Sequence, residues 1–358
     1  MLKYSIGLDI SSKKINACLS VIDAAQMVSI KASTNFSNSK QGFVQFEAWL
    51  LKHYKDKETP LVICMEATGV YYEHCALYLS DKGYKVSVIL PNKAKKYFQS
   101  IGLKSKNDSI DAKGLSQMGA EQSLSLWHPL GKYFYTLRIL TRQHQKLQEQ
   151  KTLFKNQLHA LKYGMYRNKE VEKQTQKMID LIEKQIVQVE DQIGLHLSSN
   201  KQVIEKVNNI IAIKGVGILT VATLLAETNG FILFENAKQL VSYAGYDVVE
   251  NQSGKHNGKT KISKKGNSHI RRCLFMPALS VVTLKQKPFL LLYRRTFEKH
   301  HIKMKSYVAV QKRLLTTIFA LWKRNEVYDE NHSGKSKEQE PELSLCSSAI
   351  AEGAGILN

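Results

Sequence analysis

Two acidic side chains stand in stretches of the sequence that otherwise favour buried strands. Asp9 falls within the apolar start of GLDISSKKINACLS, and Glu66 directly follows the apolar run LVICM. A carboxylate in an apolar strand is costly to bury unless a cation meets it. Either the first strand is half exposed and Asp9 faces water, or Asp9 faces a metal ion.

A second pair of acids, Asp108 and Asp111, lies in KSKNDSIDAKGLSQ. If a helix runs through this stretch, the spacing of three places both carboxylates on one face, where they repel unless a cation lies between them. Each signal alone is ordinary, because a strand aspartate is more often a turn or capping residue and an Asp-x-x-Asp pair is more often a solvated helix start. Together the acids predict a site for Mg²⁺ or Mn²⁺, since two such ions can hold both oxygens of an in-line phosphodiester displacement. The predicted catalytic metal ligands are Asp9, Glu66, Asp108 and Asp111.

The elements that must position these acids predict a mixed α/β domain over residues 1–125. Short apolar runs predict five strands, at 4–10, 15–23, 26–33, 61–65 and 85–91. Helical spacing predicts helices at 41–55, from EATGVYY to Gly83, at 92–101 and at 108–122. Three strands followed by alternating helices and strands is an RNase H-like order. In this order Glu66 ends a strand, at the sheet edge where α/β proteins build their sites.

The middle of the chain, 126–200, is predicted to be a helical linker. Stretches 134–162 and 170–198 are long, highly charged and free of proline. The second carries a heptad-like seam of Ile179, Ile182, Ile186, Val189 and Ile193. This pattern indicates a helical hairpin, which is either a coiled-coil dimerisation arm or a plain two-helix packing element. Residues 201–325 read as a second, mainly helical unit, and the polar tail at 326–358 is predicted to be disordered.

The charge of the chain points to a polyanion partner. Lysine and arginine number 52 against 31 acids, for a net charge of +21, and residues 1–325 alone carry +26. We expect nucleic acid rather than a membrane surface, because no strong amphipathic anchor is evident. No apolar run is long enough for a transmembrane helix, and the start of the chain lacks a signal-peptide pattern. Five scattered cysteines without a Cys-x-x-Cys pair favour a reduced cytoplasm, with the protein associated with the nucleoid.

The second unit contains the most basic segment, since residues 251–297 hold eleven lysines or arginines and no acid. A solvated face normally mixes signs, so this segment favours nucleic-acid binding. In IKGVGILTVATLL, a glycine turn before an apolar helix is typical of a helix-hairpin-helix whose backbone N–H groups meet a phosphate, or of a turn between core helices. The predicted nucleic-acid contacts are Gly215, Gly217, Lys255, Lys259, Lys261, Lys264, Lys265, Arg271 and Arg272.

Ser253 lies within this basic segment, followed by Gly254 and Lys255. Serine is a poor nucleophile unless a base, a metal or a cationic pocket activates it. His256 and the nearby lysines could hold a phosphate and offset charge that develops in a transition state. From the residues alone, Ser253 remains an ordinary loop serine.

GLDIS, MEATGVYY and DSIDAKGL resemble the DEDD, RuvC-like nuclease domain of the insertion-sequence one-ten family of transposases, which is related to the Piv DNA invertases. IIAIKGVGILTVATLLAE and LVSYAGYDVVENQSGKHNGKTKISKKGNSHIRRCLF resemble the C-terminal domain of that family. The resemblance covers about 1–125 and 205–290, in the same order and with a helical spacer between. One departure is Asp247-Val248, where the family commonly has Thr-Pro.

The resemblance implies a site-specific DNA recombinase that moves its own insertion element. It implies that Ser253 is the nucleophile, with Ser263 and Ser268 as competitors, and that a phosphoserine link to DNA precedes strand exchange. It also implies a structured bridge RNA that pairs with donor and target DNA, and dimers that join as a tetramer with shared active sites. The hairpin at 134–198 is the expected subunit contact.

Two other functions remain open from the sequence. A structure-specific nuclease of the Holliday-junction-resolvase type would use the same four acids, with water as nucleophile and no role for Ser253. A non-catalytic nucleic-acid-binding protein would keep the basic segment and use its carboxylates only structurally.

Overall fold

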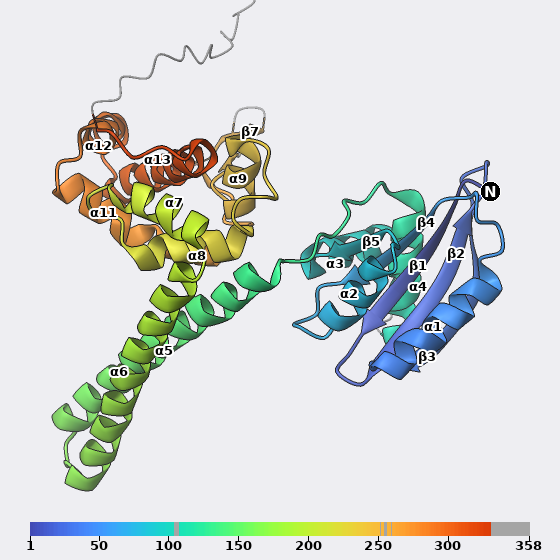
Figure 1. The fold of residues 1–358 in the computed structure, drawn as a ribbon, viewed down its shortest axis with the longest axis horizontal. Coiled ribbons are helices and arrows are strands. Elements are labelled where there is room, and N and C mark those ends of the chain that lie inside the picture. Colours follow the sequence, from blue (N-terminus) through green and yellow to red (C-terminus); the bar gives the residue numbers. More distant parts are fainter. Residues whose placement is uncertain (104–106, 251, 254–255, 259, 331–358) are drawn as a thin grey trace, which may run out of the picture. The chain divides into compact units, whose positions relative to one another are not determined.

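The computed structural model describes residues 1–103, 107–250, 252–253, 256–258 and 260–330 (Figure 1). The chain divides into two units, one ending at Leu130 and the other beginning at Gly131. The two long helices of the predicted linker belong to the second unit. Most of the tail that was predicted to be disordered lies outside the described residues.

A five-stranded sheet forms the centre of the first unit. Its strands are β1 (Lys3–Ile10), β2 (Lys14–Ile22), β3 (Val28–Ser37), β4 (Leu61–Glu66) and β5 (Val86–Ile89). The spatial order is β3-β2-β1-β4-β5. The first three strands pair antiparallel, whereas β4 runs parallel to both β1 and β5. The five predicted strands are thus present in the predicted order along the chain, and the structure adds their spatial order.

Helices cover both faces of this sheet. The helices are α1 (Lys40–His53), α2 (Glu73–Asp81), α3 (Pro91–Ser100) and α4 (Asp108–Glu121). Alternate residues of β1, such as Ile6 and Leu8, share one apolar cluster with Phe46 of α1 and Leu79 of α2. On the opposite face, Cys64 of β4 packs with residues of α3 and α4. The unit is therefore a three-layer α/β/α arrangement, in agreement with the predicted mixed α/β class.

Three local predictions in this unit are wrong. The helix expected from EATGVYY begins only at Glu73, because Glu66 still belongs to β4 and Gly69 has φ of +57°, outside the helical region. The last strand stops at Ile89, and Pro91 opens α3, where its fixed φ suits the first helical turn. The third strand extends to Ser37, since its alternating exposed and half-buried residues belong to an edge strand rather than an apolar core strand.

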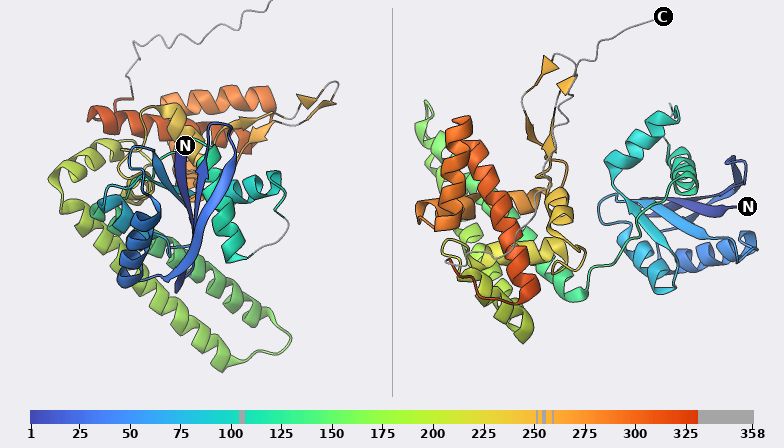
Figure 2. Two further views of the ribbon diagram at one scale, coloured as in Figure 1. Left: turned by 90° about the vertical axis from the view of Figure 1, so that its right-hand side faces the viewer. Right: turned by 90° about the horizontal axis from the view of Figure 1, so that it is seen from above.

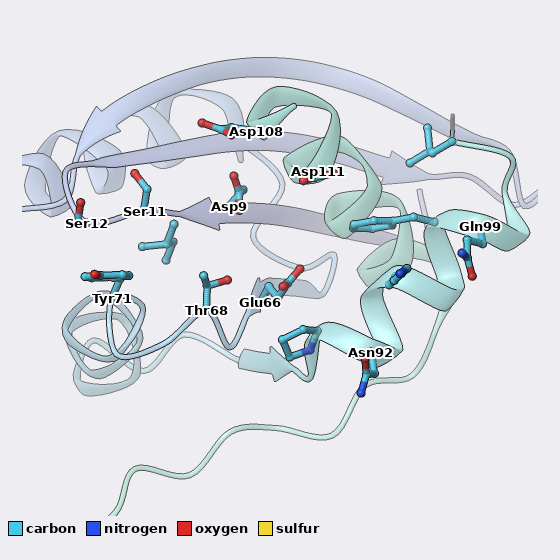
Figure 3. A pocket seen from close by; sticks show the side chains of 15 residues that line it. Asp9, Ser11, Ser12, Glu66, Thr68, Tyr71, Asn92, Gln99, Asp108 and Asp111 are labelled. Atoms are coloured by element: carbon cyan, nitrogen blue, oxygen red, sulfur yellow. The ribbon is translucent and has the colours of Figure 1, made fainter. Parts of the chain in front are cut away.

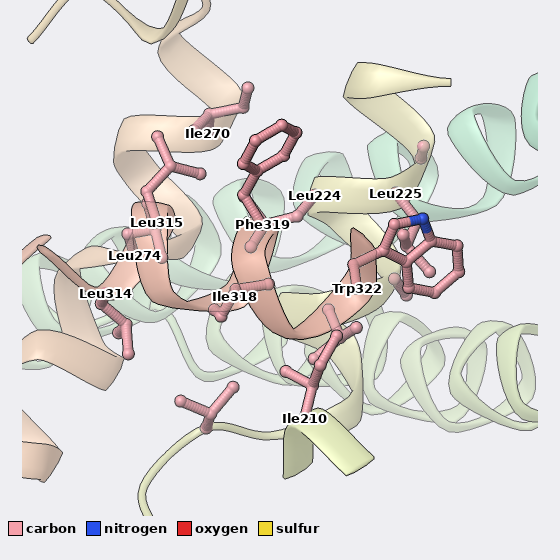
Figure 4. Close-up of a cluster of buried hydrophobic side chains, with 14 of the residues drawn as sticks. Ile210, Leu224, Leu225, Ile270, Leu274, Leu314, Leu315, Ile318, Phe319 and Trp322 are labelled. Carbon is pink, nitrogen blue, oxygen red and sulfur yellow. The ribbon is translucent and has the colours of Figure 1, made fainter. Parts of the chain in front are cut away.

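The second unit is mainly helical (Figures 1 and 2). Its helices are α5 (Lys132–Tyr163), α6 (Lys169–Ser198), α7 (Lys201–Ile211), α8 (Ile218–Thr228), α9 (Ala237–Ala244), α10 (Ser268–Cys273), α11 (Phe275–Thr283), α12 (Lys287–His300) and α13 (Lys303–Arg324). They share one apolar core, in which Phe319 and Trp322 of α13 pack near Leu224 and Leu225 of α8 (Figure 4).

Helices α5 and α6 form the hairpin that the sequence predicts. The seam residues of α6 are buried, from Ile179 to Ile193. An ion pair from Lys155 to Glu183 and a hydrogen bond between His144 Nε2 and Glu190, each 2.9 Å, join the two helices at their sides. The partner of this seam within the described residues is thus α5 of the same chain.

Four two-residue strands separate α9 from α10. They are β6 (Val248–Val249), β7 (Gln252–Ser253), β8 (His256–Asn257) and β9 (Lys261–Ile262). β6 pairs with β9 and β7 pairs with β8, so the chain forms a narrow ribbon that projects from the helices of its unit (Figure 2). In the part of the chain that the structure describes, no helix has the length and apolarity needed to cross a bilayer.

Candidate functional site

Asp9 and Glu66 lie at the same edge of the sheet, on neighbouring parallel strands. Leu8 of β1 stands beside Met65 of β4, and both are fully buried against the cluster of α1 and α2. Because side chains alternate along a strand, the next residue on each strand, Asp9 or Glu66, points to the other face. Asp9 is the penultimate residue of β1, and both acids are half-buried. The strand pairing therefore brings together two acids that are far apart in sequence.

Helix α4 lies very close to this face because glycine allows it. A Cβ on Gly7 would fall far inside contact distance of the backbone of Ala112 and Ser116, in the middle of α4. A Cβ on Gly119 would likewise collide with Ser5 of β1. Residues Ser5, Gly7 and Asp9 share one face of β1, so the backbone contact at Gly7 sets the distance between α4 and the strand that carries Asp9.

Asp108 and Asp111 occupy the first turn of α4, as the sequence predicts. Asn107 caps the helix, and its Oδ1 accepts a hydrogen bond of 2.8 Å from the Ile110 N–H. Carboxylates in a first turn are also favoured by the helix dipole, which is a structural reason for acids at these positions. Asp111 is half-buried and Asp108 is exposed.

All four predicted acids line one cavity of about 740 Å³ (Figure 3). As the side chains are placed, no three His, Cys, Asp or Glu groups of the described residues cluster closely enough to hold one metal ion. The donor set nevertheless suits a hard cation, because it consists of carboxylate oxygens. Asn16, directly opposite Asp9 on β2, is buried, and among the described residues its Nδ2 has no hydrogen-bond partner. An amide donor next to Asp9 that is unpaired within the described part of the chain is consistent with a site that binds a further group with an oxygen acceptor.

The cavity has polar walls that the sequence patterns did not single out. Thr68 and Tyr71, from the loop between β4 and α2, line one side with Ser11 and Ser12. Helix α3 contributes a further set of residues: Asn92, Lys95, Phe98 and Gln99. The sequence did not indicate the first wall, because the EATGVYY segment was predicted to be helical whereas Thr68 and Tyr71 lie in a loop. The three- and four-residue spacing of polar side chains in PNKAKKYFQS was the available signal for the second.

Ser253 belongs to the second unit and is exposed at the end of β7, paired with His256 across the ribbon. Its competitors lie nearer the base of the ribbon. The Ser263 hydroxyl donates to the Gly245 carbonyl at 3.3 Å, and Ser268 is the first residue of α10. Of the lysines predicted to contact nucleic acid, Lys261, Lys264 and Lys265 are described, whereas Lys255 and Lys259 lie outside the described residues.

Three of the other predicted nucleic-acid contacts pack against or bond to neighbouring helices. Gly215, with φ of +103°, packs against α11, where a Cβ would lie 3.0 Å from Cβ of Ser280. Gly217 is the N-cap of α8 and is exposed. Arg271 donates to the Ala244 carbonyl at 2.7 Å, and Arg272 pairs with Glu149 at 2.5 Å. Gly215 therefore serves the turn between α7 and α8, and both arginines help to hold α10 in place.

A buried carboxylate organises the base of the ribbon, and the sequence patterns missed it. Glu227 of α8 is 1% exposed and accepts hydrogen bonds from Arg142 of α5 at 2.8 and 3.0 Å. Asn267, the N-cap of α10, donates to Oε2 of Glu227 at 2.7 Å, the oxygen that also accepts one of the Arg142 bonds. The hydroxyl of Tyr243 in α9 donates to the Glu227 carbonyl at 3.1 Å. This network joins four helices around the two ends of the ribbon, and an acid at the end of an apolar helix was its sequence signal.

The pKa of Glu227 reflects a balance between burial and partners. Burial alone would raise it, but the hydrogen bonds from Arg142 and Asn267 and the charges of Arg142 and Arg138 outweigh this and hold the pKa below its usual value. Burial lowers the pKa of the neighbouring His269, whose Nδ1 lies 2.7 Å from Oε1 of Gln145. The Glu227 carboxylate is thus charged, and both of its oxygens accept hydrogen bonds, as expected of a residue that holds neighbouring helices in place.

Comparisons with known proteins match the two ends of the described chain to two separate family models. A family model for DEDD transposases of the IS110 type matches residues 6–163. A second model, described as the transposase IS116/IS110/IS902 family, matches residues 207–294. Pilin gene-inverting proteins of Moraxella bovis and Moraxella lacunata are each 28% identical over 331 residues, which is 92% of this chain and 99% of theirs. A probable family 20 transposase of Pseudomonas aeruginosa is 19% identical and covers 62% of this chain.

Among solved structures, RuvC of Thermus thermophilus in complex with a Holliday junction substrate matches 33% of this chain and 93% of its own, with 12% identity and a TM-score of 0.26. The family matches define an enzyme, a DNA transposase or recombinase. The interpretation as a non-catalytic binding protein is therefore wrong. The chain belongs to the IS110 family of transposases. Its DEDD family model implies dependence on a divalent metal ion.

Proposed function

We propose that this transposase cuts and rejoins the DNA of its own insertion element, using a metal-dependent carboxylate site and a serine nucleophile. The observation that carries the proposal is the convergence of Asp9, Glu66, Asp108 and Asp111, from three separate stretches of sequence, on one cavity. The names of the Moraxella relatives, which describe inversion of a pilin gene, support chemistry in which DNA is cut and rejoined. The basic segment of the second unit supports DNA as the substrate.

The four acids would hold two Mg²⁺ ions, or Mn²⁺ in their place. Such ions supply Lewis-acid stabilisation of the phosphate oxygens and align an in-line displacement. Asp9 and Glu66 stand on strands and would supply the fixed ligands. Asp108 and Asp111, in the first turn of α4, would turn their carboxylates toward the same space. This rotation of two side chains would bring together acids that line the cavity without forming a cluster of three among the described residues.

The Ser253 hydroxyl would be the attacking group. Its Oγ forms a bond to the scissile phosphorus while the bond from phosphorus to the leaving sugar oxygen breaks. The serine proton passes to a base and the leaving oxygen takes up a proton, so that no oxidation or reduction occurs. The phosphoserine keeps the energy of the phosphodiester for rejoining. Lys261, Lys264 and Lys265 would offset the charge of the pentacoordinate phosphate.

The proposed partners are donor and target DNA, a structured bridge RNA and further copies of the chain. Dimers that join as a tetramer would use the α5–α6 hairpin, where Leu153, Leu181 and Val187 are all more than half exposed. Apolar side chains on a helical arm fit a subunit contact. Sequencing of RNA that co-purifies with the protein tests the guide: a transcript from the flank of the gene supports it, and cellular RNA without enrichment of that flank contradicts it.

The decisive experiment for the nucleophile is Ser253→Ala. Because Ser253 is exposed, the variant should keep the wild-type melting temperature. Wild-type protein with Mg²⁺ and DNA bearing the ends of the element should leave a protein–DNA adduct that survives denaturing electrophoresis. Ser253→Ala should leave none and should neither cut nor join the DNA. Ser263→Ala and Ser268→Ala serve as controls and should keep the adduct.

The rival enzyme mechanism, a resolvase-type nuclease that uses water, makes the opposite forecast. In that case Ser253→Ala would cut at a rate close to the wild-type rate, and no adduct would form with either protein. Ser253→Cys gives a further distinction, because a thiolate can attack phosphorus although its larger sulfur disturbs the geometry. A trace of activity in that variant supports the serine mechanism.

A further inference from the structure

Helix α3 forms a polar wall of the carboxylate cavity. Asn92, Lys95 and Gln99 all line it, and their spacing of three and four residues places them on one face of the helix. All three side chains are exposed. Figure 3 shows α3 beside α4, with Asn92 and Gln99 along the cavity that also receives Asp9 and Glu66.

The position of this wall relative to the acids is fixed by packing. Gly114 of α4 leaves room for the ring of Phe98, whose Cε1 would stand 2.6 Å from a Cβ at that glycine. The hydroxyl of Tyr97 donates to Glu121 at the end of α4 at a distance of 2.7 Å. Since α4 also carries Asp108 and Asp111, these two contacts hold Lys95 in a set relation to the carboxylates.

The charge of α3 is opposite to that of the rest of the cavity. The helix contains Lys93, Lys95 and Lys96 and no acid, and Lys95 is the lysine that lines the cavity. Two divalent cations would balance four carboxylates and leave no excess positive charge for an incoming phosphate. A lysine on the wall supplies that charge, and charge-assisted hydrogen bonds to phosphate are among the stronger polar contacts.

We propose that α3 binds the DNA strand that is to be cut, with Lys95 in contact with a non-bridging oxygen at or next to the scissile phosphate. Asn92 and Gln99, on either side of Lys95 along the helix, donate hydrogen bonds to the neighbouring backbone. The wall thereby positions the strand over the carboxylates, independently of base sequence. This inference rests on the proposed function, because it takes the four acids to be the cleavage site.

Lys95→Ala tests the contact, with Lys95→Arg as the conservative variant and Lys96→Ala as the matched control. Lys96 is exposed on the same helix, does not line the cavity, and its loss removes the same charge. The substrate is a supercoiled plasmid that carries both ends of the element, cut in Mg²⁺ by protein that retains its co-purified RNA. Lys95→Ala should lower kcat/KM by about tenfold to a hundredfold, whereas Lys95→Arg should keep most of the activity and Lys96→Ala nearly all.

Binding of Mn²⁺, measured by calorimetry without DNA, separates substrate contact from damage to the metal site. Loss of a nearby cation should leave the Mn²⁺ affinity of Lys95→Ala equal to or above that of the wild type. Equal activities of Lys95→Ala and Lys96→Ala would overturn the proposal, and so would an Mn²⁺ affinity that falls together with activity. Asp9→Asn tests the carboxylate site separately, since wild-type cutting by that variant would refute the site itself and not only its α3 wall.

Discussion

The carboxylate cavity and the serine ribbon are built in contrasting ways. The acids stand on parallel strands and on a helix that touches the sheet backbone at Gly7. Ser253 stands on a ribbon whose strands are only two residues long, and its side chain is exposed. The helices at the base of the ribbon are held by hydrogen bonds. There, Glu227 of α8 accepts hydrogen bonds from residues of α5 and α10.

This contrast separates two ways to prepare a reactive group. In the first unit, backbone packing fixes the strands and the helix that carry the acids before any ligand binds, although the carboxylates of α4 would still turn toward the cavity. In the second unit, hydrogen bonds fix the two ends of the ribbon, and the serine itself is exposed. Substitutions in the first unit should therefore act through local geometry and charge, and those in the second through the base of the ribbon or through DNA binding.

The largest effect should come from the acids themselves. Asp9→Asn or Glu66→Gln should abolish strand cutting in Mg²⁺, because either change removes a charged ligand from the proposed metal site. DNA binding, measured by fluorescence anisotropy, should be nearly unchanged. Removing one of four like charges should leave the melting temperature of the metal-free protein equal or higher. Cutting by Asp9→Asn at a rate near the wild-type rate would refute the assignment.

Gly7→Ala should damage the same site without changing any acid. The added methyl group would collide with the α4 backbone, and overpacking of this kind costs roughly 1–3 kcal/mol. Both the unfolding free energy, measured by urea titration, and cutting activity should fall, since α4 carries two of the four acids.

Gly194→Ala is the control for Gly7→Ala. A Cβ at Gly194 meets no atom within 4 Å in the described structure, and the residue lies inside α6. Alanine should therefore stabilise the helix by about 0.5–1 kcal/mol. If both variants change stability in the same direction, the close approach of α4 at Gly7 is not what holds the first unit together.

The sequence predicted the elements of the first unit because their signals are local. The apolar run before Glu66 and the three-residue spacing of Asp108 and Asp111 both led to the observed strand and helix. The α3 wall and the Glu227 network could not be found this way, because they depend on packing between distant segments. The helix predicted from EATGVYY to Gly83 is present, but its predicted start is wrong because periodicity does not reveal that Gly69 adopts positive φ. The roles of the acids and of Ser253 stay predictions.

Glu227→Gln should weaken the second unit by about 2 kcal/mol, because it removes a charged hydrogen-bond partner of Arg142 from a buried position. The pKa of Glu227 is held below its usual value in the folded protein. Its contribution to stability is therefore complete above the ordinary glutamate pKa of 4.5 and is lost as the pH falls through the lower pKa of the folded state. Thermal unfolding as a function of pH measures this loss, which should be absent from Glu227→Gln.

Glu149→Gln is the matched control for Glu227. Glu149 also accepts a hydrogen bond from an arginine, Arg272, but it is a third exposed and solvent screens the pair. Its replacement should change stability far less than Glu227→Gln. Equal losses of stability in the two variants would mean that burial does not make the Glu227 network more stabilising than the exposed pair. The ribbon would then not be anchored at Glu227.

The smallest effect should come from the lysines at the foot of the ribbon. Lys265 is exposed, and Lys264 adopts φ of +52° where its backbone N–H donates to the Gly245 carbonyl at 3.1 Å. Alanine keeps that backbone bond, so Lys264→Ala with Lys265→Ala should fold normally. For every lysine that binds a phosphate, its replacement should reduce the slope of log affinity against log salt by roughly 0.9 on duplex DNA. Titration at several salt concentrations measures the slope, and an unchanged value would place both lysines away from the DNA backbone and confine DNA binding by the ribbon to its outer end.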